Sequence, residues 1–172
     1  MITDRHVVTA AHCVHYHKAH ELFVGIGDWD KDVQDYGEIL TAVVKVDVHP
    51  KYKYLVSNSS FNRNFDFNIF SSMTFEADLA VIELAQSVMF DQYKQPVAIG
   101  MPDIDLRNSS FNSTGWGTLR ERGQSSQRLR RVEVPHYDFE ACKEIYSILG
   151  LTTVKVREGM ICAGKSEKEY DF

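Results

Sequence analysis

A ten-residue run of mostly apolar side chains, Ile39 to Val48, most limits the folds that this chain can adopt. The run contains four valines and ends at His49-Pro50. Its β-branched side chains favour a strand, because they crowd a helix but pack well on a pleated sheet. Short strand-like runs also occur at Leu22 to Ile26, Ala80 to Leu84, Val97 to Gly100, Phe111 to Gly115, Arg131 to Pro135 and Gly159 to Cys162. Short strands separated by turn-rich connections predict an all-β barrel or sandwich.

Two segments depart from this strand pattern. Asp138 to Ser147 is the only segment that we expect to form a helix. Tyr54 to Phe75 is irregular and rich in Asn, Ser and Phe. A structureless stretch of this length is usually either a functional loop or a disordered one. No internal repeat or linker divides the chain, so we expect one domain over residues 1–172.

The composition excludes several classes of protein. The chain is 44% hydrophobic and carries a formal net charge of −5. A negative chain of this kind lacks the broad basic face that binding to nucleic acid requires. No apolar run reaches the roughly 18 residues that a membrane-spanning helix needs. Met1 to His6 has no apolar region, so we expect no secretory signal in the chain as given.

Four motifs follow one another in a fixed order. The segment Val7-Val8-Thr9-Ala10-Ala11-His12-Cys13 places a histidine at the end of an apolar strand, and Asp78-Leu79-Ala80-Val81-Ile82-Glu83-Leu84 places a carboxylate before a later one. Thr114-Gly115-Trp116-Gly117 and Met160-Ile161-Cys162-Ala163-Gly164 come next. A single histidine is usually structural and Asp before a strand is a common turn residue, so the weight lies in the whole segment Val8 to Cys13 and in the order of the four motifs. Together and in this order they resemble the trypsin-like serine proteases.

The resemblance implies a fold and a division of labour. It implies two antiparallel six-stranded β-barrels with one short helix, both barrels incomplete at the chain termini. Residues 1–100 would form most of the first barrel, and residues 101–172 the start of the second. His12 would be the general base, and Asp78 the carboxylate that orients its imidazole.

The resemblance also pairs the cysteines. Cys142 and Cys162 match a disulfide of the family, and two free buried thiols are the alternative. Cys13 would be unpaired, because its usual partner in the family lies upstream and none of the first twelve residues is a cysteine.

The nucleophile motif Gly-Asp-Ser-Gly-Gly does not occur in the 172 residues. We therefore expect the chain as given to be inactive, and we interpret it as a fragment of a secreted serine endopeptidase. A non-catalytic homologue that acts as a binding or regulatory module is the alternative. The final residues, Tyr170-Asp171-Phe172, resemble the run before the nucleophile motif. On that resemblance Asp171 would lie at the base of the primary pocket and select Arg or Lys, and an exposed chain end is the alternative.

Two clusters have metal-binding chemistry. Five carboxylates occur between residues 28 and 38, and Asp28, Asp35 and Glu38 resemble the acidic positions of a calcium loop in some trypsins. Oxygen ligands suit this hard cation, although charge runs in general are more often solvated loops. The reaction itself requires no cofactor. The competing enzymatic interpretation is a zinc site, because four histidines have spacings that could ligate this metal: His12, His15, His17 and His20. We favour the interpretation that they are exposed histidines of a loop.

The remaining signals concern the surface. We expect one basic loop to be solvated, and binding of an anionic partner is the alternative. This loop contains five arginines: Arg120, Arg122, Arg128, Arg130 and Arg131. Asn58 and Asn108 begin N-glycosylation sequons, whereas the sequon at Asn112 falls on a predicted strand. We expect an extracellular location for the full-length protein, with polypeptide substrates and protease inhibitors as partners. The irregular loop before Asp78 would then overhang the substrate cleft.

Overall fold

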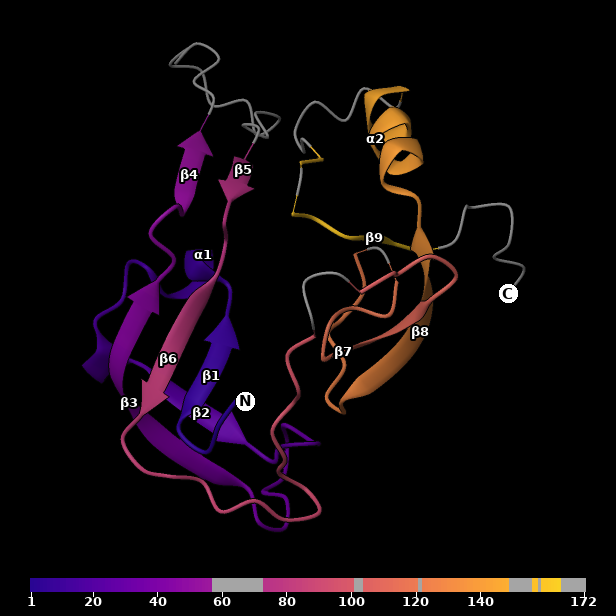
Figure 1. The fold of residues 1–172 in the computed structure, drawn as a ribbon. Coiled ribbons are helices and arrows are strands. Elements are labelled where there is room, and N and C mark those ends of the chain that lie inside the picture. The colour runs from indigo at the N-terminus through magenta and orange to yellow at the C-terminus, as the bar shows by residue number, and fades with distance from the viewer. Residues whose placement is uncertain (57–72, 101–103, 121, 149–155, 158, 165–172) are drawn as a thin grey trace, which may run out of the picture. The chain divides into compact units, whose positions relative to one another are not determined.

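The computed structural model describes residues 1–56, 73–100, 104–120, 122–148, 156–157 and 159–164, and Figure 1 shows their fold. The chain divides into two compact units, each built from segments that are separate in the sequence. The first contains Met1–His49, Leu79–Asp105 and Asn112–Glu133. The second contains Pro50–Asp78, Leu106–Phe111 and Val134–Phe172. The expected barrel boundary between residues 100 and 101 stays a prediction.

A four-stranded antiparallel sheet forms the centre of the first unit (Figure 1). Its strand order is β1 (His6–Thr9), β6 (Ala80–Leu84), β3 (Ile39–Val48) and β2 (Phe23–Ile26). The bounds of β3 and β6 are those predicted from the sequence. The pairing of β3 with β6 shifts register between Val43 and Lys45. An irregularity of this kind bends a strand and increases its twist, which helps the sheet to curl.

The apolar core of the first unit lies against this sheet. Alternate residues of β6 are buried, with Ala80, Ile82 and Leu84 each at most 6% exposed. Val43 of β3 is 3% exposed. Because side chains of a strand alternate between its two faces, this pattern places one face of β6 in the core.

A hairpin in the second unit corrects one sequence prediction. β4 (Lys53–Val56) pairs with β5 (Met73–Glu76), and the register runs from Lys53 opposite Glu76 to Val56 opposite Met73. Tyr54 to Phe75 was expected to be irregular throughout, but both of its ends are strands. The two strands were missed because the apolar stretches at the ends of the segment are short and most of the segment is rich in Asn and Ser. Residues 57–72 lie outside the described part of the chain.

A three-stranded sheet has the order β7 (Ser110–Gly115), β8 (Arg130–Tyr137) and β9 (Cys162–Ala163). The predicted strands match β7 and β8 closely, but the last strand is only two residues long. Val97–Gly100 was predicted as a strand and forms none. That run is only four residues long and follows Pro96, which has no N–H to donate to a ladder. Val97 and Ile99 are 64% and 73% exposed, so no core holds them in place.

The predicted helix is present as α2 (Phe139–Ile148). A one-turn helix, α1 (Ala11–Val14), and a 3₁₀ turn, η1 (Ala19–Glu21), were not predicted. The fold class is the predicted one, with curled antiparallel sheets and short helices that correspond to two incomplete β-barrels. No helix among the described residues is long and apolar enough to cross a membrane.

Candidate active site

His12 lies on the helical turn α1 rather than on the strand that leads to it. β1 ends at Thr9, Ala10 is extended, and the turn begins at Ala11. Ala11 and Val14 are 0% and 5% exposed, and their spacing of three places both on one face of the helix. The intervening residues, His12 and Cys13, are therefore exposed on the opposite face. This arrangement presents the imidazole to solvent from a firmly anchored turn.

The Cys13 thiol contacts the His12 ring. Its Sγ lies 3.3 Å from His12 Nε2, and the thiol is exposed and forms no disulfide. The prediction that Cys13 is unpaired is confirmed in this structure. The contact occupies the nitrogen that a general base would use, so proton transfer at Nε2 requires the imidazole to turn away from the thiol.

Asp78 directly precedes Leu79 and is half-buried. Thr9, the last residue of β1, pairs with Ala80, the first residue of β6. The chain therefore enters β6 at the same end of the sheet at which it leaves β1 (Figure 1). His12 follows that strand end by three residues, and Asp78 precedes the other by two. Because the two residues belong to different compact units, the pairing of their side chains stays a prediction.

The predicted disulfide is confirmed. Cys142 on α2 is bonded to Cys162 on β9, with their Cα atoms 6.4 Å apart. Cys162 also pairs with Tyr137 at the end of β8, next to the start of the helix. The bond therefore fastens the helix to the strand pair from which it emerges.

The predicted calcium ligands lie together. One carboxylate oxygen each of Asp28, Asp35 and Glu38 lies within 4.8 Å of the others. Backbone N–H groups of Trp29 and Asp30 donate to Asp35 Oδ2, over 2.5 and 2.8 Å. Burial, followed by repulsion from Glu38 and Asp35, raises the pKa of Asp28 above its ordinary value. The loop therefore forces carboxylates together at an electrostatic cost.

Asp30 does not join this cluster, although it lies in the same acidic run. Its Oδ2 accepts a hydrogen bond from Arg128 Nε over 2.9 Å, and this bond lowers the pKa of Asp30. The Arg128 guanidinium also lies 4.9 Å from the centroid of the Trp29 ring. Arg128 is exposed, as expected for a solvated basic loop, and its side chain also joins this segment to the acidic loop of residues 28–38.

The buried side chain of Lys94 supports the acidic loop. Nothing in the sequence indicated this contact. The residue is 7% exposed, and its Nζ donates to the Gly37 carbonyl over 2.7 Å and to Asp91. A Cβ at Gly27 would lie 3.2 Å from Lys94 Cγ, and one at Gly37 would lie 3.1 Å from Nζ. Both glycines have positive φ, 85° and 74°. The lysine thus runs beneath both ends of the loop, where larger residues would collide with it.

The structure does not support the zinc interpretation. Among the described residues, the only group of three or more metal-ligating side chains is Asp28, Asp35 and Glu38. The His15 ring lies tilted against the Tyr16 ring with the centroids 3.6 Å apart, and His17 lies 3.9 Å from a carboxylate oxygen of Glu21. These histidines point to separate local partners.

Other predicted site residues are placed as follows. Asn108 lies in an exposed turn with φ 59°, immediately before β7. Asn58 and Asp171 lie outside the described residues.

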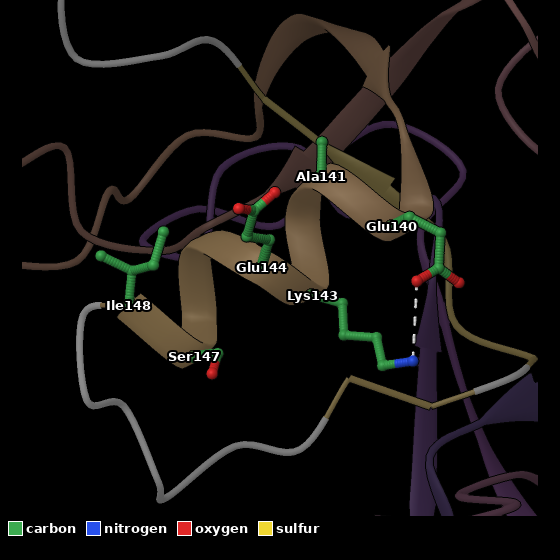
Figure 2. A pocket seen from close by; sticks show the side chains of 6 residues that line it. All are labelled: Glu140, Ala141, Lys143, Glu144, Ser147 and Ile148. Atoms are coloured by element: carbon green, nitrogen blue, oxygen red, sulfur yellow. Dashed lines mark ion pairs between the residues drawn. The ribbon is translucent and has the colours of Figure 1, made fainter.

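A hollow of about 530 Å³ lies along α2 (Figure 2). Figure 2 shows Lys143 beside Glu140, and their charged atoms are 3.6 Å apart. Glu144, Ser147 and Ile148 complete most of the lining. None of the predicted catalytic residues lines this hollow, so it is not a candidate for the reaction site.

Comparisons with known proteins agree on one family. The family model described as Trypsin matches residues 1–171. Chymotrypsin-like elastase family member 1 of Homo sapiens is 32% identical over 165 residues, which cover 95% of this chain and 55% of that protein. Venom serine protease Bi-VSP of Bombus ignitus is 29% identical over 99% of this chain and 43% of its own length. The chain therefore spans about half the length of these relatives.

A solved structure supports the fold. The crystal structure of the scabies mite inactivated protease paralogue S-D1 matches with a TM-score of 0.71 and 19% identity. The match covers 96% of this chain and 63% of that one. At this identity the likeness concerns the fold alone.

Proposed function

Because the chain belongs to the trypsin family of serine proteases, we propose that the whole protein is a serine-type endopeptidase to which this chain contributes the general base, His12, and its orienting carboxylate, Asp78. The pairing of Thr9 with Ala80 carries the proposal. It joins the ends of two strands that are distant in the sequence, and the chain segments with His12 and Asp78 extend from that end. A base and its orienting group must approach each other in this way to act together.

The reaction assigns one task to each group. His12 Nε2 takes the proton of a serine hydroxyl as the hydroxyl attacks the peptide carbonyl, and later delivers that proton to the leaving amine. Asp78 accepts a hydrogen bond from Nδ1–H, which holds the tautomer that leaves Nε2 free to accept. The Asp78 carboxylate also stabilises the imidazolium that forms. The contact between the Cys13 thiol and His12 Nε2 must break before the first step.

The nucleophile is the part that the 172 residues do not supply. They contain no Gly-Asp-Ser-Gly-Gly, the motif that provides both the serine and the backbone donors for the oxyanion in the family. We therefore expect the chain as given neither to cleave peptides nor to react with a fluorophosphonate probe. The first experiment is to sequence the transcript beyond the codon for Phe172 and to express the extended protein.

The extended protein tests the roles directly. We expect fluorophosphonate labelling and peptide cleavage by the extended protein. His12→Ala should lower kcat about a million-fold, and Asp78→Asn about ten-thousand-fold. His17→Ala is the matched control, because His17 is also exposed but pairs with Glu21. Normal turnover by the His12→Ala variant would show that the base has been assigned wrongly.

The second candidate function is a non-catalytic homologue. The fold neighbour from the scabies mite is called an inactivated protease paralogue. A stop codon directly after Phe172 in the transcript, together with no labelling, would establish this alternative. An in-frame Gly-Asp-Ser-Gly-Gly would exclude it.

We also propose that the acidic loop binds calcium. The donor set fits the ion, since Asp28, Asp35 and Glu38 offer clustered carboxylate oxygens, which hard cations prefer. Asp28 Oδ1 is buried and accepts no hydrogen bond from the described residues. A bound cation would stabilise the loop by offsetting the burial and the carboxylate repulsion that together raise the pKa of Asp28.

Calorimetry and thermal unfolding test the calcium site. Ca²⁺ at one hundred times its dissociation constant should stabilise the chain by about 2.7 kcal/mol. Asp28→Asn should remove the heat of binding and the rise in Tm, whereas Asp32→Asn should retain both. Equal calcium responses of the two variants would contradict the assignment.

Substrate and location follow from the family at a coarser level. We propose polypeptide substrates, protease inhibitors as partners and an extracellular location.

We further propose that Asp171 selects Arg or Lys and that the segment between β4 and β5 limits access to the cleft. Replacing Asp171 with Ser in the extended protein should lower kcat/KM for substrates with Arg or Lys at the cleaved bond. Excision of residues 57–72 should broaden the range of substrates, and unchanged selectivity would contradict the role of this loop.

A further inference from the structure

The turn before β7 holds an asparagine in an unusual backbone conformation. Ser109 N–H donates to the Leu106 carbonyl over 3.0 Å and closes the turn. Asn108 lies within it at φ 59° and is exposed. Asn is among the few residues that adopt this left-handed conformation readily. The side chain is therefore presented on a tight, well-defined turn at the surface.

The residues around Asn108 have the pattern of a modification site. Asn108-Ser109-Ser110 places a hydroxyl two residues after the amide, as N-linked glycosylation requires. Asn112, in the nearby sequon, instead lies within β7, whose backbone belongs to the β7-β8-β9 sheet. A surface turn is the usual location of a glycosylated asparagine.

A polar hollow of about 560 Å³ adjoins this turn. His136 N–H donates to the Ser109 carbonyl over 2.8 Å. This bond joins the two segments that line the hollow, residues 107–110 and 135–138. The lining mixes hydroxyl, amide, imidazole, guanidinium and carboxylate groups, which come from Arg107, Asn108, Ser109, Ser110, Pro135, His136 and Asp138. Closely spaced donors and acceptors of this kind suit the hydroxyl and acetamido groups of a sugar.

We propose that Asn108 carries an N-linked glycan and that the first sugar of this glycan occupies the adjacent hollow. The inference rests on the proposed extracellular location, since the modification occurs in the secretory pathway. In the transfer, the Asn108 amide nitrogen attacks C1 of an oligosaccharide linked to a lipid diphosphate. A C–N bond forms, the C–O bond to the diphosphate breaks, and the amide nitrogen loses one proton.

Mass spectrometry of the chain made behind a signal peptide in insect cells tests the acceptor. Release of the glycan by peptide N-glycosidase in ¹⁸O water should convert Asn108 into labelled Asp. Ser110→Ala should abolish the modification, and Ser110→Thr should retain it. Thr114→Ala removes the sequon at Asn112 and should leave the glycan at Asn108 unchanged. An unmodified Asn108 in chains that have entered the secretory pathway would overturn the proposal.

Asn108→Gly separates the two roles of the asparagine. Glycine adopts positive φ without strain, so this variant should lose the glycan while preserving the turn. We expect the Tm of the unglycosylated chain from the bacterial periplasm to be the same for the wild type and this variant. In a Thr114→Ala background, equal glycan content of the peptide around residue 108 with and without Asn108→Gly would show that Asn108 is not the acceptor, and the proposal would be wrong.

NMR tests the position of the first sugar. The same wild-type chain is compared with its glycan, from insect cells, and without it, from the bacterial periplasm. The ring signals of His136, which lines the hollow, should shift between the two forms, whereas those of His17 should not. Unshifted His136 signals would exclude the hollow as the site of the sugar. None of these measurements depends on proteolysis, so the glycan and the endopeptidase proposals can fail separately.

Discussion

His12 illustrates how a single residue acquires its setting. The sequence predicts a histidine at a strand end, but the structure places it on a helical turn, because Ala11 and Val14 enter the core together. Two exposed residues remain on the other face, and they contact each other at 3.3 Å. The identity of the candidate base is thus readable from the motif. The contact of its ring with Cys13 Sγ cannot be read from the motif.

Asp30 gives a residue-scale prediction. The hydrogen bond from Arg128, and then that from the backbone of Asp32, lower its pKa below the ordinary value of 3.8. A carboxyl group with a lowered folded-state pKa stabilises the protein above its unfolded-state pKa, and loses this effect as the pH falls through the folded-state value. Asp30→Asn should therefore lower Tm near about pH 7, and the difference should fade below about pH 4.

Asp32→Asn is the control for this measurement. It removes the same charge from the same loop, but the Asp32 side chain is exposed and only its backbone donates to Asp30. Its Tm should follow that of the wild type across the pH range. A pH-independent difference between Asp30→Asn and the wild type would contradict an ionic origin of the stabilisation.

Loops and helices in this chain are held by contacts that join distant segments. The acidic loop is fastened to Lys94 on one side and to Arg128 on another. α2 is fastened to β9 by the disulfide. The helix and the cysteine pairing were predictable, since the first has a local pattern and the second comes with the family. The lysine brace was not, because a lone Lys in a polar segment resembles any surface residue.

Removing the charge of Lys94 should loosen the acidic loop. Lys94→Met keeps the aliphatic stem beneath Gly27 but removes the donor to the Gly37 carbonyl. Hydrogen bonds from charged groups contribute about 1.5–3 kcal/mol each, so we expect a loss of this order in the free energy of urea unfolding. Lys45→Met is the matched control, because Lys45 pairs with Asp47 on the surface and is 60% exposed. An equally small effect of both variants would show that Lys94 is not a brace.

The disulfide gives a second prediction at this scale. Cys142 and Cys162 are 20 residues apart, and closing a loop of this length stabilises a folded chain by about 3 kcal/mol. The double variant Cys142→Ser/Cys162→Ser should lose a comparable free energy of unfolding. Cys13→Ser should not, because its thiol is exposed and forms no disulfide. Denaturant titrations of the three proteins decide this, and an unchanged midpoint in the double variant would refute it.

At a larger scale, one face of the four-stranded sheet carries large apolar side chains that the described residues leave exposed. β2 lies at one edge of its sheet. Phe23 and Leu40 are 61% and 72% exposed. Phe23 pairs with Ala42, and Gly25 with Leu40, so both large side chains lie on the same face. An open edge beside an apolar face promotes association between chains.

We therefore expect the 172-residue chain to self-associate as its concentration rises. The double variant Phe23→Lys/Leu40→Lys should sediment as a monomer with little change in Tm, because both side chains are already in water. Val43→Lys is the contrasting change, since Val43 is 3% exposed and a lysine there should unfold the sheet. Sedimentation velocity at several concentrations measures the outcome. Association that persists in the double variant would show that another surface is responsible.

The sequence by itself determined most of the strand runs, the main helix, the family motifs and the cysteine pair. Each of these has a local signature, either a side-chain period or a short motif in a fixed order. The hairpin strands β4 and β5 escaped prediction, because only a few residues at each end of an Asn- and Ser-rich segment carry the strand character.

Only the tertiary structure decided that Asp30, one of the five clustered carboxylates, turns to Arg128. It also decided that the ends of β1 and β6 meet, on which the pairing proposed for His12 and Asp78 depends. The physical reason is the same in each case. Backbone pairing and ion pairs between segments tens of residues apart depend on where the chain returns in space, and no local pattern of residues records that return.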